Sequence, residues 1–289
     1  MPGLLALVLV TGVWGVTFVQ VKDAVAVYPL FAFLALRFGI ASLTLGLPGA
    51  RRLHSLGRDG VRAGAVAGAL LAGGYALQTL GLQRTTVSGA GFVTGMYVVL
   101  TPLLAFALFR IRVGRSAWAG VALATVGLAM LAGVHAGSVK GDLLVLAGAA
   151  VYALQIVLLE RYAPRYDPLA FTLVEMLFAF AVLACAAAPR LAIPHGWTVW
   201  GALLVTGVFA SALAFVVQTW AQRTASATRT AIVFSLEPVW AAVFGYALAG
   251  DRLGALGFGG FASIMAGIGL SEPSAGTTLV RLRRRSRTA

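Results

Sequence analysis

Long apolar segments, separated by short polar ones, fill almost the whole chain. A helix needs about 20 mostly apolar residues to cross a hydrocarbon core of about 30 Å. Ten segments reach or approach that length, at residues 4–21, 30–49, 63–83, 89–109, 116–134, 143–159, 168–188, 198–220, 227–249 and 254–270. They are too long and too uniformly apolar for the alternating strands of a transmembrane barrel. The pattern predicts an all-α integral membrane protein with ten transmembrane helices.

The composition agrees with this prediction. Hydrophobic residues make up 60% of the 289-residue chain and charged residues 11%, whereas roughly a quarter of the residues in a soluble domain are charged. These values exclude an ordinary soluble enzyme or binding module, and also intrinsic disorder. The formal net charge of +13 does not indicate a nucleic-acid partner, because the bases lie in short clusters between apolar segments. The single cysteine, Cys185, excludes internal disulfides and a cysteine metal cluster.

The distribution of Lys and Arg predicts the orientation. If the N-terminus is cytoplasmic, 16 bases fall in the cytoplasmic loops and the tail and 5 in the outer loops, while Arg37 lies inside a span. Cytoplasmic loops of membrane proteins carry an excess of bases. We therefore expect a multi-pass protein of the cytoplasmic (inner) membrane with both termini in the cytoplasm. The basic cytoplasmic tail, residues 272–289, is expected to lie against anionic lipid headgroups or to act only as a topological anchor.

The two halves of the chain resemble each other at an offset near 139 residues. Five matches follow in the same order: Tyr28-Pro29-Leu30 with Asp167-Pro168-Leu169, Gln78-Thr79 with Gln218-Thr219, Gln83-Arg84-Thr85 with Gln222-Arg223-Thr224, Thr101-Pro102 with Glu237-Pro238 after a three-residue slip, and Gly120 and Gly127 with Gly260 and Gly267. Each half, residues 1–136 and 140–271, contains five predicted spans, so the second half enters the membrane from the opposite face. Such inverted repeats occur in many transporters, although channels and scaffolds can also be built from repeats.

Several short motifs resemble those of one known family. They are Trp14-Gly15-Val16-Thr17-Phe18, Leu36-Arg37-Phe38, the segment from Gln222 to Arg229, and Ser235-Leu236-Glu237-Pro238-Val239 followed by Gly250-Asp251. Together they resemble the EamA-type transporters of the drug/metabolite transporter superfamily, over nearly the whole chain. The resemblance implies two five-helix EamA repeats and movement of small metabolites, often export of amino acids or related compounds. Glu175 departs from it, because the family more commonly has a neutral residue there.

Three charged side chains fall inside predicted spans, where a charge costs several kcal/mol. Arg37 is a candidate anchor for a substrate carboxylate, since its guanidinium matches that group, or a structural partner of a helix carbonyl or a glutamate. Glu237 is a candidate proton-coupling carboxyl or ligand for a substrate amine, or a packing residue beside Pro238. Glu175 could pair with Arg37 only if their helices bring the two to the same depth.

The spans also contain nine neutral polar or aromatic candidates for lining a substrate cavity: Trp14, Thr17, Gln20, Gln78, Tyr97, Tyr152, Gln155, Gln218 and Trp240. As a set they favour a cavity for an amphipathic solute, although each alone could simply hold helices together, at roughly 0.6 kcal/mol. Pro102 and Pro238 are expected to kink their helices, and Pro238 to free the carbonyl of Phe234.

Residues suited to catalysis are missing from the spans. The aspartates and histidines all lie in loops or at helix ends, and the chain has no phosphate-binding Gly-x-x-x-x-Gly-Lys motif. We therefore expect no enzyme activity, cofactor or metal. The predicted function is a secondary transporter that exports a small metabolite, an amino acid or related compound, by alternating access around spans 1, 3, 4, 6, 8 and 9. Proton coupling is a hypothesis. The alternatives are an uptake transporter for a carboxylate or vitamin and a non-saturating channel or membrane scaffold, and the oligomeric state is open.

Overall fold

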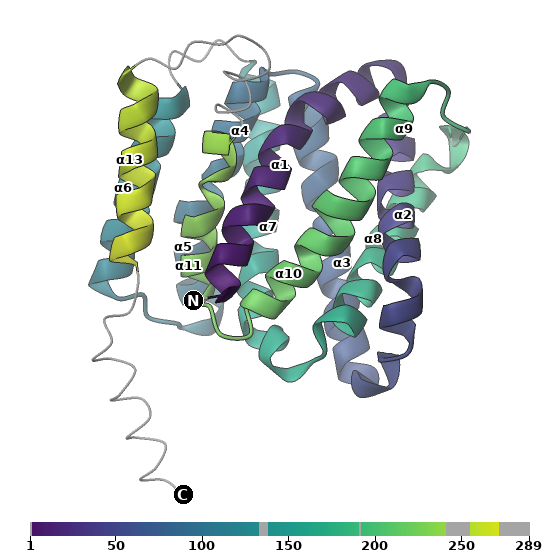
Figure 1. Cartoon of the computed structure of the whole chain (residues 1–289), viewed down its shortest axis with the longest axis horizontal. Helices are drawn as coiled ribbons and strands as arrows, with labels where there is room; N and C mark the ends of the chain where they lie inside the picture. The colour runs from purple at the N-terminus through teal and green to yellow at the C-terminus, as the bar shows by residue number, and fades with distance from the viewer. Residues whose placement is uncertain (1, 133–137, 191, 241–254, 272–289) are drawn as a thin grey trace, which may run out of the picture.

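The computed structural model of the protein describes residues 2–132, 138–190, 192–240 and 255–271. Within these ranges every regular element is a helix, and no strand occurs. The helices stand beside one another in one bundle (Figure 1). The predicted all-α class is confirmed for this part of the chain.

Seven helical segments of the described chain are long and apolar enough to cross a membrane. Five are single helices: α1 (Pro2–Val27), α2 (Leu30–Ala50), α3 (Gly57–Leu82), α7 (Val139–Tyr162) and α8 (Pro168–Ala187). Two are composite: α4 (Val87–Gly95) continues into α5 (Tyr97–Phe109), and α9 (Trp197–Leu204) continues through the π-helical η4 (Val205–Leu213) into α10 (Ala214–Ala221). Three 3-10 turns, η1 (Leu53–Ser55), η2 (Ala163–Arg165) and η3 (Ala188–Arg190), lie at helix ends.

The other three predicted spans contain shorter described helices. α6 (Arg115–Ala132) and α13 (Ala255–Leu270) are apolar but fall below the length of a full span in the described residues. α11 (Ala227–Phe234) begins the ninth predicted span, whose residues from 241 onward lie outside the described residues. The chain is therefore a multi-pass membrane protein with seven candidate spans in its described part.

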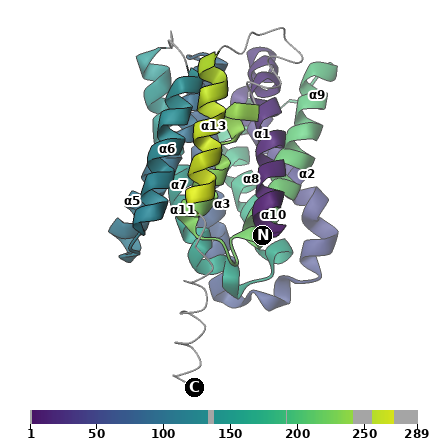
Figure 2. The same ribbon diagram turned by 60° about the vertical axis from the view of Figure 1, so that its left-hand side comes forward.

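Glycines bring α6 and α13 into backbone contact at one edge of the bundle, where the two helices lie side by side (Figures 1 and 2). A Cβ added to Gly120 would lie 2.7 Å from the carbonyl oxygen of Gly267, and one added to Gly267 would lie 2.7 Å from that of Gly120. A Cβ added to Gly127 would lie 2.5 Å from the carbonyl oxygen of Gly260. Neither helix could approach so closely with a side chain at these positions, which is the role of small residues in membrane helix contacts.

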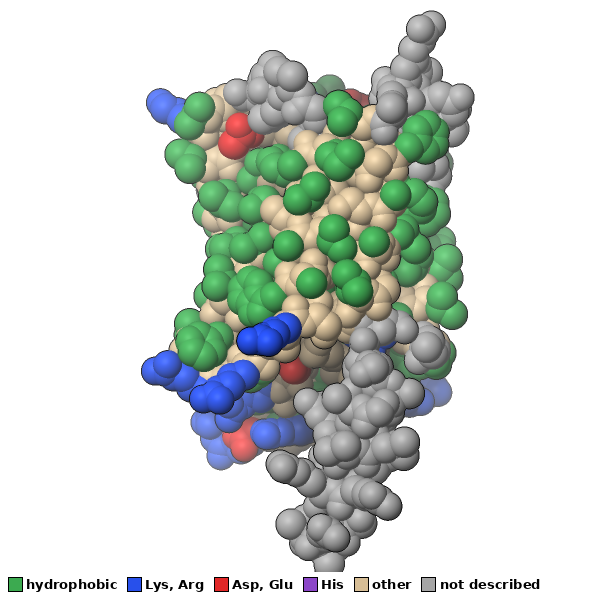
Figure 3. Space-filling model, turned by 90° about the vertical axis from the view of Figure 1, so that its left-hand side faces the viewer, with side chains coloured by type: hydrophobic (Ala, Val, Ile, Leu, Met, Phe, Trp, Pro, Cys, Tyr) green, Lys and Arg blue, Asp and Glu red, His purple; other side chains and the backbone are tan. Residues whose placement is uncertain are grey.

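The outer surface suits lipid. Apolar side chains cover the middle of the molecule in Figure 3, while Lys and Arg gather mainly toward one end. Large side chains such as Leu9 and Leu43 are 73% and 82% exposed. A continuous apolar surface of this size would promote aggregation in water, whereas in a bilayer it contacts hydrocarbon.

Asp167 ties two helices together in the loop before α8. Its carboxylate accepts hydrogen bonds from the backbone N–H groups of Leu169 and Ala170 at 3.0 and 3.2 Å, which caps α8. Arg52, which follows α2, approaches the same carboxylate at 2.8 Å. Partial burial works against ionisation of Asp167, but the hydrogen bonds from Arg52 and from the backbone outweigh it and hold the pKa below its usual value.

Candidate functional site

A cavity lies inside the bundle between α1, α2, α3, α4, α5, α7, α10, α11 and the residue Glu237. The volume open to the centres of water-sized spheres is about 60 Å³, which is room for a few water molecules or a small solute. Nine of the twelve candidates for substrate contact line it: Trp14, Thr17, Arg37, Gln78, Tyr97, Tyr152, Gln155, Gln218 and Glu237. Seven of these helices belong to the expected spans 1, 3, 4, 6, 8 and 9, since α4 and α5 share span 4, and α2 joins them through Arg37.

Arg37 is a buried cation, only 2% exposed. Its Nε donates to the Ser211 hydroxyl at 2.8 Å and its Nη2 to the Tyr75 hydroxyl at 3.1 Å. The guanidinium carbon also lies 4.3 Å from the centre of the Tyr75 ring, within the range of a cation–π contact. In the described part of the chain no carboxylate lies within 4.0 Å of this guanidinium. Arg37 is thus held in place by neutral groups, and its positive charge has no ionic partner there.

The π-helical turn of η4 supplies the partner of Arg37. Ser211 lies in this turn, next to Ala210, whose carbonyl accepts a hydrogen bond from Trp14 Nε1 at 2.8 Å. Gly207, one turn earlier, faces α2 so closely that an added Cβ would lie 3.0 Å from the Arg37 carbonyl oxygen. The turn therefore fixes α1 and α2 to the same wall of the cavity. π-helical turns within α-helices often occur at functional sites.

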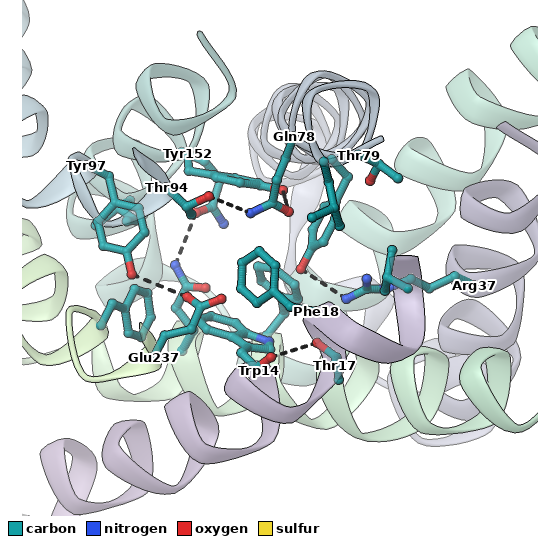
Figure 4. A pocket seen from close by; sticks show the side chains of 18 residues that line it. Trp14, Thr17, Phe18, Arg37, Gln78, Thr79, Thr94, Tyr97, Tyr152 and Glu237 are labelled. Carbon is teal, nitrogen blue, oxygen red and sulfur yellow. Dashed lines mark hydrogen bonds between the residues drawn. The ribbon is translucent and has the colours of Figure 1, made fainter. Parts of the chain in front are cut away.

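Glu237 lies on the opposite side of the cavity from Arg37 (Figure 4). Its side chain is 8% exposed, and the Tyr97 hydroxyl donates to Oε2 over 3.4 Å. Within the described residues Glu237, like Arg37, lacks an ion pair. Phe18 lies between the two charged residues in the view of Figure 4.

Tyr97 and Glu237 each directly follow a helix interruption. α4 ends before Met96, whose N–H bonds the Val93 carbonyl at 3.2 Å, and α11 ends before a turn in which Leu236 N–H bonds the Val233 carbonyl at 3.1 Å. These hydrogen bonds between residues i and i+3, as in a 3-10 helix, tighten the chain just before each cavity residue.

The two prolines predicted to kink their helices both lie beyond these interruptions. Pro102 lies inside α5, six residues after Met96. Pro238 comes two residues after Leu236, so both interruptions precede the prolines.

Glutamines and hydroxyl groups form the polar part of the wall. Gln78 donates to Thr94 at 3.0 Å and accepts from the Tyr152 hydroxyl at 3.1 Å. Gln155 accepts from Gln218 at 3.1 Å. These bonds join α3, α4 and α7 on one side and α7 and α10 on another.

Three candidates do not line the cavity. Glu175 is fully buried on α8 and accepts from Gln155 Nε2 at 2.8 Å, so it lies behind the wall. It does not pair with Arg37, whose donors are directed at Ser211 and Tyr75. Gln20 is half-buried on α1, and the Trp240 ring packs 3.8 Å from where a Cβ on Gly12 would be.

Other wall residues were not among the sequence candidates. Tyr75 and Thr79 of α3, Thr94 of α4, and the aromatic rings of Phe18, Phe215 and Phe234 also line the cavity. Tyr75 lies three residues before Gln78, so helical spacing alone would have placed it on the same face. Ser211 lacks such a signal, because its direction depends on the π-helical turn.

Comparison with known proteins gives the family. The EamA-like transporter family matches residues 1–133 and again residues 139–271. The chain belongs to this family. Its members in the drug/metabolite transporter superfamily are transporters, which agrees with a multi-pass membrane protein that handles a small-molecule substrate.

Relatives support the same assignment. An uncharacterized transporter of Archaeoglobus fulgidus is 33% identical over 253 residues, which cover 86% of this chain and 79% of the relative. The human protein named solute carrier family 35 member F6 is 30% identical over 136 residues, covering 43% of this chain and 37% of that protein. A crystal structure of 20% identity superposes with a TM-score of 0.76 over 93% of this chain and 96% of the other. At this identity the superposition shows a shared fold alone.

Proposed function

We propose that this EamA-family protein exports a small amino acid or a related zwitterionic metabolite across the cytoplasmic membrane. The observation that carries the proposal is that Arg37 and Glu237, two buried groups of opposite charge type, lie on opposite sides of one cavity and have no ion pair within the described residues. A solute with a carboxylate at one end and an ammonium at the other matches both.

Arg37 is suited to the carboxylate. A buried charge without a counter-ion is strongly unfavourable, and a bound carboxylate would supply the counter-ion. Ser211 and Tyr75 occupy Nε and Nη2, whereas Nη1 makes no hydrogen bond within the described residues. A carboxylate could therefore bind Nη1 without displacing a protein partner.

Glu237 is suited to the ammonium group, and the rings of Trp14, Phe18, Phe215 and Phe234 offer an apolar surface for a side chain between the two ends. The free volume of about 60 Å³ favours a small solute. The same carboxyl is our candidate for proton coupling, because a proton and an ammonium group would compete for it.

Alternating access by two inverted repeats is the proposed mechanism. We assign ten spans to repeats at residues 1–136 and 140–271, followed by the basic tail 272–289, with both termini cytoplasmic. The contact of α6 with α13 supports this arrangement. Gly120 and Gly260 are repeat mates, as are Gly127 and Gly267, and the contacts join each glycine to the mate of the other. A two-fold axis in the membrane plane would produce this pattern.

Counterflow in liposomes tests the substrate class. Purified protein is loaded with unlabelled solute and assayed for exchange of labelled amino acids, matching carboxylates without the amino group, and matching amines without the carboxylate. We expect saturable exchange of zwitterions by wild type and by the lipid-facing variant Leu43→Ala, and loss of exchange in Arg37→Gln. Exchange of carboxylates alone would instead favour the alternative of a carboxylate or vitamin substrate, and flux without saturation would indicate a channel. If the protein exchanges no solute, and no solute stabilises it, the result would favour a membrane scaffold.

The coupling hypothesis has its own assay. Exchange of the accepted solute is measured with and without a pH gradient in wild type and Glu237→Gln. A gradient effect in wild type that is absent from the variant supports Glu237 as the coupling site. An equal effect in both would remove Glu237 from that role.

A further inference from the structure

A chain of three buried glutamines runs behind and into the cavity wall. Gln222 Nε2 donates to the backbone carbonyl of Ile156 at 2.8 Å, and Gln218 Nε2 donates both to Gln222 Oε1 and to Gln155 Oε1 at 3.1 Å each. Gln155 Nε2 then donates to Glu175 Oε1 at 2.8 Å. Each of these four side chains is at most 1% exposed.

One end of this chain is a backbone carbonyl, which can only accept, and that fixes the orientation of every amide in it. A backbone carbonyl cannot donate, so Gln222 must turn its NH₂ group toward Ile156 and its oxygen toward Gln218. Gln218 must then turn its NH₂ group toward Gln222, and the same group reaches Gln155. Gln155 in turn faces Gln218 with its oxygen and needs an acceptor on its other side. Glu175 Oε1 is that acceptor.

The orientation leaves one amide oxygen without a donor, and Glu175 Oε2, at the end of the chain outside the cavity, also has none within the described residues. Gln218 uses both N–H groups within the chain, and its Oε1 is closed off from solvent and has no hydrogen bond within the described residues. A buried acceptor left without a donor costs about 1–3 kcal/mol. Gln218 and Glu237 line the same cavity. An N–H donor on a solute would satisfy this oxygen as the wall adjusts around it.

We propose that Gln218 Oε1 is a second acceptor for the amino group of the transported solute and that Glu175, outside the cavity, positions it through Gln155. The inference rests on the proposed function, since it names residues that would bind the amino group of the substrate or position that binding group. An ammonium group has three N–H donors, so Glu237 leaves two of them for other oxygens. Glu175 is a positioning residue here, because it touches Gln155 rather than the solute.

The chemistry of Glu175 suggests a matched pair of variants. Glutamine at this position retains an oxygen that can accept from Gln155, whereas methionine of similar length offers no comparable acceptor. Glu175→Gln should therefore retain what Glu175→Met loses. A third variant, Gln218→Met, removes the proposed acceptor, Gln218 Oε1, itself.

The test measures one ratio in detergent-solubilised protein: the affinity for an accepted amino acid divided by that for the same molecule without its amino group. Isothermal titration gives both affinities, and Leu43→Ala serves as the lipid-facing control. We expect Gln218→Met to lower the ratio about tenfold, chiefly through weaker binding of the amino acid. Glu175→Met should lower it several-fold, and Glu175→Gln should restore it.

The outcomes separate this inference from the proposed function. If wild type binds no amino acid, or binds the molecule without its amino group equally well, the proposed function fails. If wild type prefers the amino acid and Gln218→Met keeps that preference, Oε1 receives its donor from water or protein and the inference is wrong. A loss of affinity for both molecules alike in Glu175→Met, without rescue in Glu175→Gln, assigns Glu175 a purely structural role and also overturns it. Should Glu175→Met fail to fold, Gln155→Met breaks the same chain one link later and takes its place.

Discussion

The cavity and the contact between α6 and α13 differ in what lies between their helices. Around the cavity, amide, hydroxyl and charged side chains are buried. Within the described residues Arg37 has no ionic partner and Gln218 Oε1 has no hydrogen-bond donor. At the α6–α13 contact, Gly120 and Gly267 place backbone against backbone, and the Ser263 hydroxyl donates to the Leu123 carbonyl across the same contact at 2.7 Å. We infer that the contact holds the fold together, whereas the cavity gives up stability in order to bind a solute.

Replacing Arg37 separates the two roles most clearly. In Arg37→Met we expect solute affinity to fall at least about 30-fold, because a desolvated charged contact is lost. Stability of the ligand-free protein should change little, since an uncompensated buried charge is removed together with its hydrogen bonds to Ser211 and Tyr75. Titration and thermal unfolding in detergent measure the two quantities. A large drop in ligand-free stability with unchanged affinity would reverse the comparison.

Filling the glycine contact should have the opposite result. Gly120→Ala places a methyl group 2.7 Å from the Gly267 carbonyl oxygen, and the forced separation should cost about 1–3 kcal/mol. Gly46→Ala is the matched control, because no atom lies within 4 Å of its added Cβ. Unfolding in detergent should distinguish the variants, with solute affinity unchanged in both. A contact that accepts the methyl group without loss would show that it does not hold the fold.

Trp14 lines the cavity and also joins α1 to η4 through its hydrogen bond to the Ala210 carbonyl, so it should show a mixed effect. Trp14→Phe retains a ring against Phe215 and Phe234, 5.6 and 4.8 Å away between centroids in the wild type, but loses the bond to the Ala210 carbonyl. We expect about 1 kcal/mol lower stability and a loss of affinity of a few-fold. Equal stability of the variant and wild type would mean that the bond to η4 is not needed to hold α1.

Asp167 lies outside both regions and should show the smallest effect. Its pKa is lowered in the folded state, so its contribution is fully present above the unfolded pKa of about 3.9 and is lost as pH falls through the folded value. Asp167→Asn keeps an oxygen to cap α8 but removes the charge opposite Arg52. We expect at most about 1 kcal/mol lower stability near neutral pH and a smaller decline on acidification below about pH 4. A decline equal to that of wild type would assign the acid sensitivity elsewhere.

The sequence predicted the helices more fully than the site. Apolar segments of membrane-spanning length mark the helices directly. Polar and charged side chains within those segments, some of them paired by the repeat, led to nine residues that line the cavity. Ser211 escaped prediction because its direction depends on a π-helical turn, for which the apolar pattern carries no signal. The position of Glu175 behind the wall was equally hidden, since depth along a helix does not specify which side of it a residue faces.

The glycine contact between α6 and α13 also limits which substitutions these two helices can accept during evolution. Where two helices meet through their backbones, the close approach depends on a few positions that carry no side chain, while inward-facing neighbours such as Ser263 and Ile264 also contact the facing helix. Substitutions on the outer faces of α6 and α13 can then accumulate freely as the surrounding lipid changes. The glycine positions and the side chains beside them would then be the part of this interface that a diverging chain has to keep.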